Sequence, residues 1–162
     1  MPKPEPKKRK LHFETLDAVV AEVEELQNRG YQSHGNWDLA QTAVHLANWL
    51  RYPMDGFPVA PIYVRPIFWF MKVTVGPSLK KKILANGFSG GMPTAPESVP
   101  EKNQFNDAEG ARKLLEIIDR AKNFDGHLHP SPLFGAMEKD VWIKVTLLHS
   151  EHHLGYLEPS VK

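Results

Sequence analysis

Three of the eight histidines in this 162-residue chain fall within five positions near the C-terminal end: His149, His152 and His153. Successive residues of an α-helix are about 100° apart, so His149 and His153 would lie on one face, one turn from each other. Two imidazoles at this spacing can bind one metal ion, as in the zincin metalloproteases. Ser150 follows His149 where the zincin motif has glutamate, so a zincin-type site is not indicated.

His45 is the best candidate for a third ligand. Its expected helical face carries Thr42, Leu46 and Trp49, an apolar setting for a group that prefers water. A single core histidine is more often hydrogen-bonded to a neighbour than bound to metal, but helix bundles do build metal sites from facing helices. Together with His149 and His153, it could hold zinc, nickel, iron or manganese and leave coordination positions open for water or substrate.

Three further polar side chains are candidates for the surroundings of such a site. His152 is rotated by about 100° from His153, so it would border the site or face solvent. Asn48 and Tyr156 each follow a candidate ligand by three positions, and ordinary packing between helices is the alternative for both. The remaining histidines have no supporting context, or lie in a loop that would have to fold over the site: His12, His34, His127 and His129.

Four segments with helical periodicity must position these side chains: 15–29, 39–52, 108–123 and 139–157. Apolar residues recur every three or four positions in each, the pattern of a helix with one buried face. Asp38 and Gln41 form a capping-box pattern at the start of the second segment. We therefore expect an all-α protein, an antiparallel up-and-down four-helix bundle that buries its four apolar stripes together.

The region between the second and third helices is harder to interpret. Residues 66–85 could form an extra helical segment, which Gly76 and Pro77 should kink or break. The apolar run Ile67–Met71 predicts a buried helix or strand, with a dimer contact or an interfacial segment as the alternatives. Residues 86–103 are rich in glycine and proline and predict a long loop, and residues 126–132 predict a second.

Composition limits the kind of protein further. The chain has no cysteine, which excludes disulfides, thiolate zinc sites and a cysteine nucleophile. A net charge of +1 argues against a generally basic nucleic-acid binder. Residues 1–12 are expected to be a disordered basic tail, and 13–158 a single domain. No apolar run is long enough for a membrane span and no secretion signal is evident, so a cytoplasmic protein is expected.

The chain resembles the DinB-like superfamily, specifically a branch of unknown function. The similarity extends from about residue 15 to 157 and is carried by Trp37–Gln41, His45–Ala47, Phe134–Met137, Trp142 and His149–Leu154. The resemblance implies a four-helix bundle, frequently dimeric, with a metal ion held by the three histidines at positions 45, 149 and 153. Superfamily members with known activity include thiol-dependent S-transferases and a maleylpyruvate isomerase, which use low-molecular-weight thiols.

One departure from the superfamily pattern bears on the substrate. Many members follow the double histidine with Arg-Gly-Gln, whereas this chain has Leu154-Gly155-Tyr156. The leading hypothesis is a metal-dependent enzyme of thiol S-transferase or hydrolase type, acting on a small molecule that the sequence does not identify. A non-catalytic metal-binding bundle, acting as a sensor or interaction module, is the alternative. A third hypothesis is association with nucleic acid or a membrane surface through Lys7–Lys10 and Lys80–Lys82.

Overall fold

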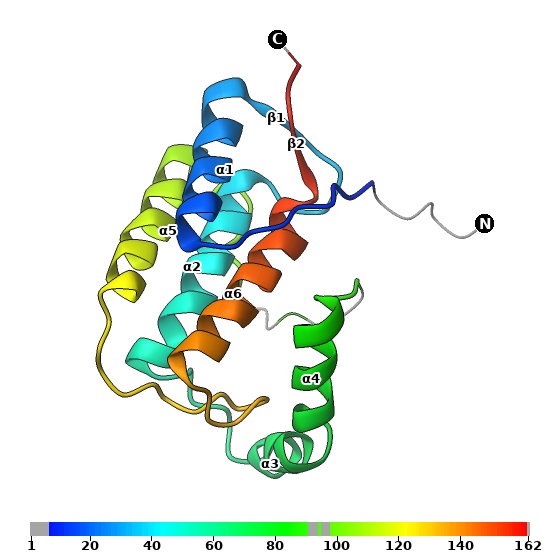
Figure 1. Cartoon of the computed structure of the whole chain (residues 1–162), viewed down its shortest axis with the longest axis vertical. Coiled ribbons are helices and arrows are strands. Elements are labelled where there is room, and N and C mark those ends of the chain that lie inside the picture. Colours follow the sequence, from blue (N-terminus) through cyan, green and yellow to red (C-terminus); the bar gives the residue numbers. More distant parts are fainter. Residues whose placement is uncertain (1–6, 91–93, 95–97, 162) are drawn as a thin grey trace, which may run out of the picture.

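The structure is a computed structural model that describes residues 7–90, 94 and 98–161 (Figure 1). This part of the chain is mostly helical, in agreement with the expected all-α class. None of its helices combines the length and apolar character needed to cross a membrane. The elements in chain order are α1 (Leu16–Arg29), β1 (Tyr31–Ser33), α2 (Leu39–Asp55), α3 (Arg65–Thr74), α4 (Gly76–Asn86), α5 (Asp107–Lys122), α6 (Lys139–Leu154) and β2 (Leu157–Pro159).

Helices α1, α2, α5 and α6 share one hydrophobic core. Helix α2 buries most of its residues, because its side chains are apolar or small over most of its circumference. Its closest neighbour is α5, and the two axes approach at Gly110. A Cβ atom at Gly110 would lie only 2.7 Å from the Cα of Ala40, so this approach requires glycine. Figure 1 shows α2 between α5 and α6, with α1 across one side.

Local sequence signals explain most helix ends. The Asp38 side chain accepts a hydrogen bond from the Gln41 backbone, and the Gln41 side chain accepts one from Asp38, the expected capping box. Helix α2 runs to Asp55, past the predicted end at residue 52. Pro53 is tolerated in the last turn, where its carbonyl accepts a hydrogen bond from the His129 backbone at 2.7 Å. Pro53 therefore lies within the last turn of α2 and does not end the helix.

Helix α6 ends earlier than predicted, at Leu154 instead of residue 157. A Cβ atom at Gly155 would lie 2.8 Å from the carbonyl oxygen of Arg9, so glycine lets the N-terminal segment cross here. The following residues form β2, which pairs antiparallel with β1. No strand was predicted, because three residues are too few to show an alternating pattern.

The expected extra helical segment is two helices, α3 and α4, which meet at Gly76. A Cβ atom at Gly76 would lie 2.1 Å from the carbonyl oxygen of Leu133, and Pro77 follows directly. The prediction of a buried Ile67–Met71 run is wrong: α3 buries none of its residues, and Trp69 is 63% exposed. Apolar composition alone did not reveal that no described element covers the apolar side chains of this helix.

The loop between α4 and α5 and the described part of the N-terminal tail both contact the rest of the molecule. Residues of the loop between α4 and α5 reach the C-terminal half of α6 and the middle of α2. The expectation of a loop at 91–93 and 95–97 lies outside the described residues, as does the expectation of disorder for residues 1–6. In the described part of the tail, Lys7 pairs with Glu158 and Arg9 pairs with Glu22.

Candidate metal centre

Two helices bring three histidine side chains together. His45 comes from the middle of α2, and His149 and His153 come from the last turns of α6. The Nε2 atom of His149 lies 3.3 Å from that of His45 and 3.0 Å from that of His153. One ligand nitrogen from each of the three lies within 4.8 Å of the others, so the cluster could hold a metal ion.

Two of the separations between ring nitrogens are close to those needed around one ion. With zinc–nitrogen bonds of about 2.0–2.1 Å in a tetrahedral site, neighbouring ligand nitrogens are about 3.3–3.4 Å apart. The two Nε2 separations at His149 are close to this value. Three imidazoles would fill three corners of a tetrahedron, which leaves a further position for water or substrate.

Burial keeps the three rings in the form that binds metal. His45 and His149 are only 2% and 4% exposed. Desolvation lowers the pKa of His45 to about 4 and that of His153 to about 2, and it lowers the pKa of His149 well below its ordinary value. All three are therefore neutral at pH 7, and a neutral imidazole has the free lone pair that coordination requires.

Hydrogen bonding among the rings does not account for their arrangement. The Nε2 atom of His149 faces the Nε2 atoms of both other histidines. A ring nitrogen either carries one hydrogen or offers one lone pair, so it cannot form two good hydrogen bonds of this kind at once. A cation bound by three converging lone pairs would satisfy all three nitrogens. The arrangement fits a metal ion better than a neutral hydrogen-bonded cluster.

The outer ring nitrogens are placed differently. His45 Nδ1 lies 3.0 Å from the Ser98 hydroxyl, which can accept its N–H and fix the tautomer that exposes Nε2. His149 Nδ1 is buried and has no hydrogen-bond partner among the described residues. A histidine that binds a metal normally donates the N–H of its other ring nitrogen to a hydrogen-bond acceptor. The Ser98 hydroxyl can play this part for His45.

Aromatic rings enclose the cluster. Trp37 stacks on His153 with ring centroids 4.9 Å apart and an interplanar angle of 16°. Trp49 and Phe88 lie against His149, at centroid distances of 4.2 and 5.0 Å. These rings exclude water from the histidines, which explains the desolvation. Low local polarity also strengthens electrostatic interactions within the site.

Polar groups gather at the edge of the cluster. His152 Nδ1 lies 3.2 Å from the carbonyl oxygen of Phe88 and 2.9 Å from Lys8 Nζ. The Lys8 ammonium also lies over the Tyr156 ring, 5.5 Å from its centroid. Burial lowers the pKa of Lys8, against the raising effect of Glu151. The His152 ring thus lies between those of His153 and Tyr156, at centroid distances of 4.8 and 5.6 Å, and Lys8 contacts the same edge.

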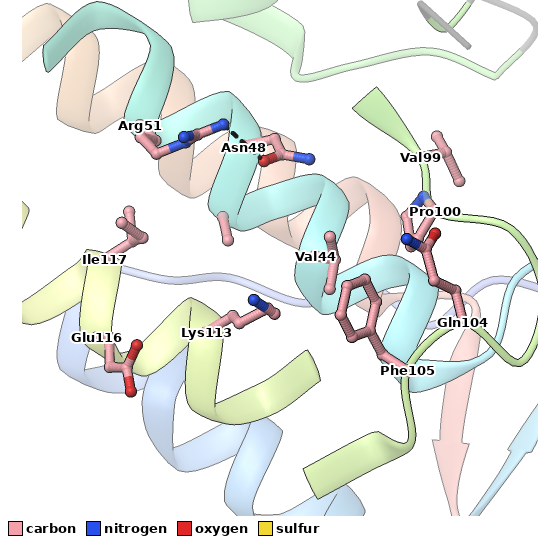
Figure 2. Close-up of a pocket in the computed structure, with 11 residues that line it drawn as sticks. Val44, Asn48, Arg51, Val99, Pro100, Gln104, Phe105, Lys113, Glu116 and Ile117 are labelled. Carbon is pink, nitrogen blue, oxygen red and sulfur yellow. Dashed lines mark hydrogen bonds between the residues drawn. The ribbon is translucent and has the colours of Figure 1, made fainter. Parts of the chain in front are cut away.

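Asn48 reaches the site only through the loop. Its amide donates a hydrogen bond to the Ser98 carbonyl oxygen at 3.2 Å, and Ser98 in turn contacts His45. The side chain also lines a cavity of about 440 Å³ between α2 and α5 (Figure 2). Arg51, Lys113 and Glu116 project around this cavity, but none of the three histidines lines it.

The structure also separates the remaining histidines from the cluster. His34 pairs with Glu158, and His12 lies 3.5 Å from a carboxylate oxygen of Glu151. Neither belongs to the described group that could hold a metal ion, and the same holds for His127 and His129.

Sequence reasoning missed four neighbours of the cluster: Lys8, Trp37, Phe88 and Ser98. Trp37 was noticed only as part of a motif. The long loop was the only sequence signal for Phe88 and Ser98, because long loops in compact domains are often functional. Nothing in the local sequence of Lys8 pointed to a helix end more than 140 positions away.

Fold and cluster together define a helical protein with a candidate three-histidine metal site. The chain belongs to a family whose description is "Protein of unknown function (DUF1569)", and the match covers residues 5–160. No curated protein and no solved structure matches the chain significantly.

Proposed function

We propose that the chain is a DinB-like metalloenzyme. It would bind one divalent ion through His45, His149 and His153 and use this ion in catalysis. The observation that carries this proposal is the convergence of three neutral imidazoles from two helices, two of them buried and one half-buried. Among the described residues, the group that could hold the ion consists of histidines alone and contains no carboxylate. We further propose that the helical body is the four-helix bundle of that superfamily and that the protein is a homodimer.

Zinc and nickel are the first candidates for the ion, and iron and manganese follow. A ligand set made only of imidazole suits zinc, nickel and iron, whereas manganese prefers oxygen ligands. When bound, such an ion would supply Lewis acidity, which favours the anionic form of a water or thiol at neutral pH.

The chain's own residues divide the remaining work. Ser98 and Trp37 orient His45 and His153, and the aromatic rings of Trp49 and Phe88 exclude water. Lys8, His152 and Tyr156 supply donors at the edge of the cluster. These donors suit a substrate with anionic or polar groups, such as a low-molecular-weight thiol in an S-transfer reaction or a hydrolysable acyl or phosphoryl compound.

A non-catalytic metal-binding protein is the second candidate. The close aromatic packing around the histidines favours it, because little space is left beside the ion for a large substrate. The cavity between α2 and α5 lies apart from the three histidines. A sensor or interaction module would bind the ion with the same residues and turn over no substrate.

Elemental analysis of the purified chain, with matched variants, tests metal binding. We expect one divalent ion per chain, lost in His45→Ala and His149→Ala and retained in His127→Ala, which removes an exposed loop histidine. Full metal content in both cluster variants would refute the assignment. Assays with thiols, electrophiles and ester substrates then separate the two candidates, since only an enzyme shows rates that disappear with the metal.

A further inference from the structure

Exposed apolar side chains are concentrated in one part of the molecule. Among the described residues, all but one of the large hydrophobic side chains that are exposed lie between residues 59 and 75; the exception is Val161. Within α3, Ile67, Trp69 and Phe70 are 59%, 63% and 60% exposed. Figure 1 shows α3 at the end of the molecule opposite the C-terminus, with α4 rising beside it. Exposed apolar side chains concentrated in one part of a molecule indicate a contact site.

The same region has a single sign of charge. Residues 56–96 contain five basic side chains and no acidic one, whereas the other residues contain fifteen basic and nineteen acidic side chains. None of the five has a carboxylate partner among the ion pairs of the described residues. By contrast, Lys7 and Arg9 of the N-terminal cluster are ion-paired within the chain. The five basic residues are Arg65, Lys72, Lys80, Lys81 and Lys82.

We propose that α3 and α4 form a docking surface for an anionic lipid membrane. Aromatic and aliphatic side chains of a surface helix enter the boundary between headgroups and acyl chains, and tryptophan and tyrosine favour that depth. Lysines beside them are attracted to anionic headgroups. Trp69 and Tyr63 would supply the first interaction and Lys80–Lys82 the second. Helix α3 has ten residues, so it would lie on the membrane and not span it.

A second copy of the chain fits this surface less well. In a two-fold dimer the same patch faces itself, so five unpaired cations would meet five others without an acidic residue between them. That arrangement is unfavourable, whereas an anionic lipid surface complements both the charge and the apolar side chains.

The distribution of side chains around α3 favours lipid over an acidic protein. Ile67, Phe68, Trp69 and Phe70 are consecutive, so they project in directions about 100° apart, and each is at least 40% exposed. A rigid protein surface would cover one face of this helix and leave the other rings in water. Fluid acyl chains can surround rings that point in several directions.

Vesicle co-sedimentation of the full chain tests this proposal. We expect binding to vesicles of phosphatidylcholine mixed with phosphatidylserine, weak binding to phosphatidylcholine alone, and a decrease in binding as salt screens the charges. Two double variants, Trp69→Ser with Phe70→Ser and Lys81→Glu with Lys82→Glu, should each lower partitioning on the order of tenfold or more. Val161→Ser and Lys102→Glu are the matched controls, because both residues are exposed outside the patch.

The variants should fold normally, because α3 buries no side chain and Lys81 and Lys82 of α4 are exposed, and circular dichroism checks this. Any of four results would overturn the proposal. One is failure to bind either vesicle type; another is binding that neither double variant weakens. The third is a chain that does not bind vesicles and sediments as a dimer, where the double variant Trp69→Ser with Phe70→Ser sediments as a monomer. This result would assign the surface to a second copy of the chain. Binding of an acidic protein in place of vesicles would likewise exclude lipid as the partner.

Discussion

At the scale of single residues, the candidate site depends on the burial of histidines that carry no charge. His45 sits in the centre of α2, where its Nδ1 meets Ser98 and its Nε2 faces α6. Burial alone is unfavourable for an imidazole that must take up a proton, so this cluster makes the folded chain sensitive to acid when no metal is bound.

The metal-free protein should lose stability as the pH falls from 7.5 to 5. The folded-state pKa of His45 is lowered to about 4, below the unfolded value of about 6.5, so the unfolded chain binds more protons between these values. Stability is therefore complete above about pH 6.5 and declines toward pH 4. Between pH 7.5 and 5, His45 alone accounts for about 2 kcal/mol of this decline, because each pKa unit corresponds to about 1.4 kcal/mol.

Urea unfolding of the chelator-treated protein at several pH values measures this dependence. His45→Gln should flatten the pH dependence, and His127→Ala, which alters an exposed loop residue, should leave it unchanged. A free energy of unfolding that does not change between pH 7.5 and 5 would contradict the burial of these rings.

At the scale of elements, the relative position of α2 and its neighbours decides whether the site forms. Residue spacing within α6 is enough to align His149 with His153, since both lie on one helix. The approach of His45 requires α2 to pack correctly between α5 and α6. Gly110 is the residue of α5 that permits the closest contact with α2.

Gly110→Ala should destabilise the fold. The added Cβ would lie 2.7 Å from the Cα and 2.9 Å from the carbonyl oxygen of Ala40, both backbone atoms of α2 that cannot rotate away. Overpacking of this kind costs about 1–3 kcal/mol, even though alanine is the better helix former. Thermal or urea unfolding provides the measurement. In the control Gly90→Ala, the new Cβ meets only the Tyr156 hydroxyl at 3.8 Å, so little change is expected.

Helix positions were predictable because the apolar period and the caps are local features. All four long segments are helices close to their predicted ranges. The ends differ where a distant segment intervenes, as at Gly155, which lies under the backbone of Arg9. The exposure of Trp69 was not predictable for the same reason, because burial of an apolar helix depends on whether another element covers it.

At the scale of the whole molecule, a bound ion would join two helices that are distant in sequence. His45 and His153 are separated by more than one hundred positions, and the described structure connects their helices through packing at the shared core. An ion held by both helices would stabilise the folded state only, because the unfolded chain does not keep the three nitrogens together.

Zinc or nickel should raise the thermal unfolding midpoint of the chelator-treated chain. At one hundred times the dissociation constant, binding adds about 2.7 kcal/mol, which corresponds to a rise on the order of 5–10 °C for a chain of this size. Calorimetry with and without the ion gives the shift. His149→Ala should show none, and an equal shift in that variant would mean that the ion stabilises the fold from another site.

The sequence by itself determined the helical segments, the alignment of His149 with His153 on one helix face, and the absence of cysteine ligands or nucleophiles. It also pointed to His45, because a histidine among apolar neighbours is unusual. Only the tertiary structure decided that His45 meets the other two, that Ser98 and Phe88 approach from a loop, and that α3 stays uncovered. The physical reason is range: helical periodicity and capping act over a few residues, whereas coordination distance and burial depend on how distant segments pack.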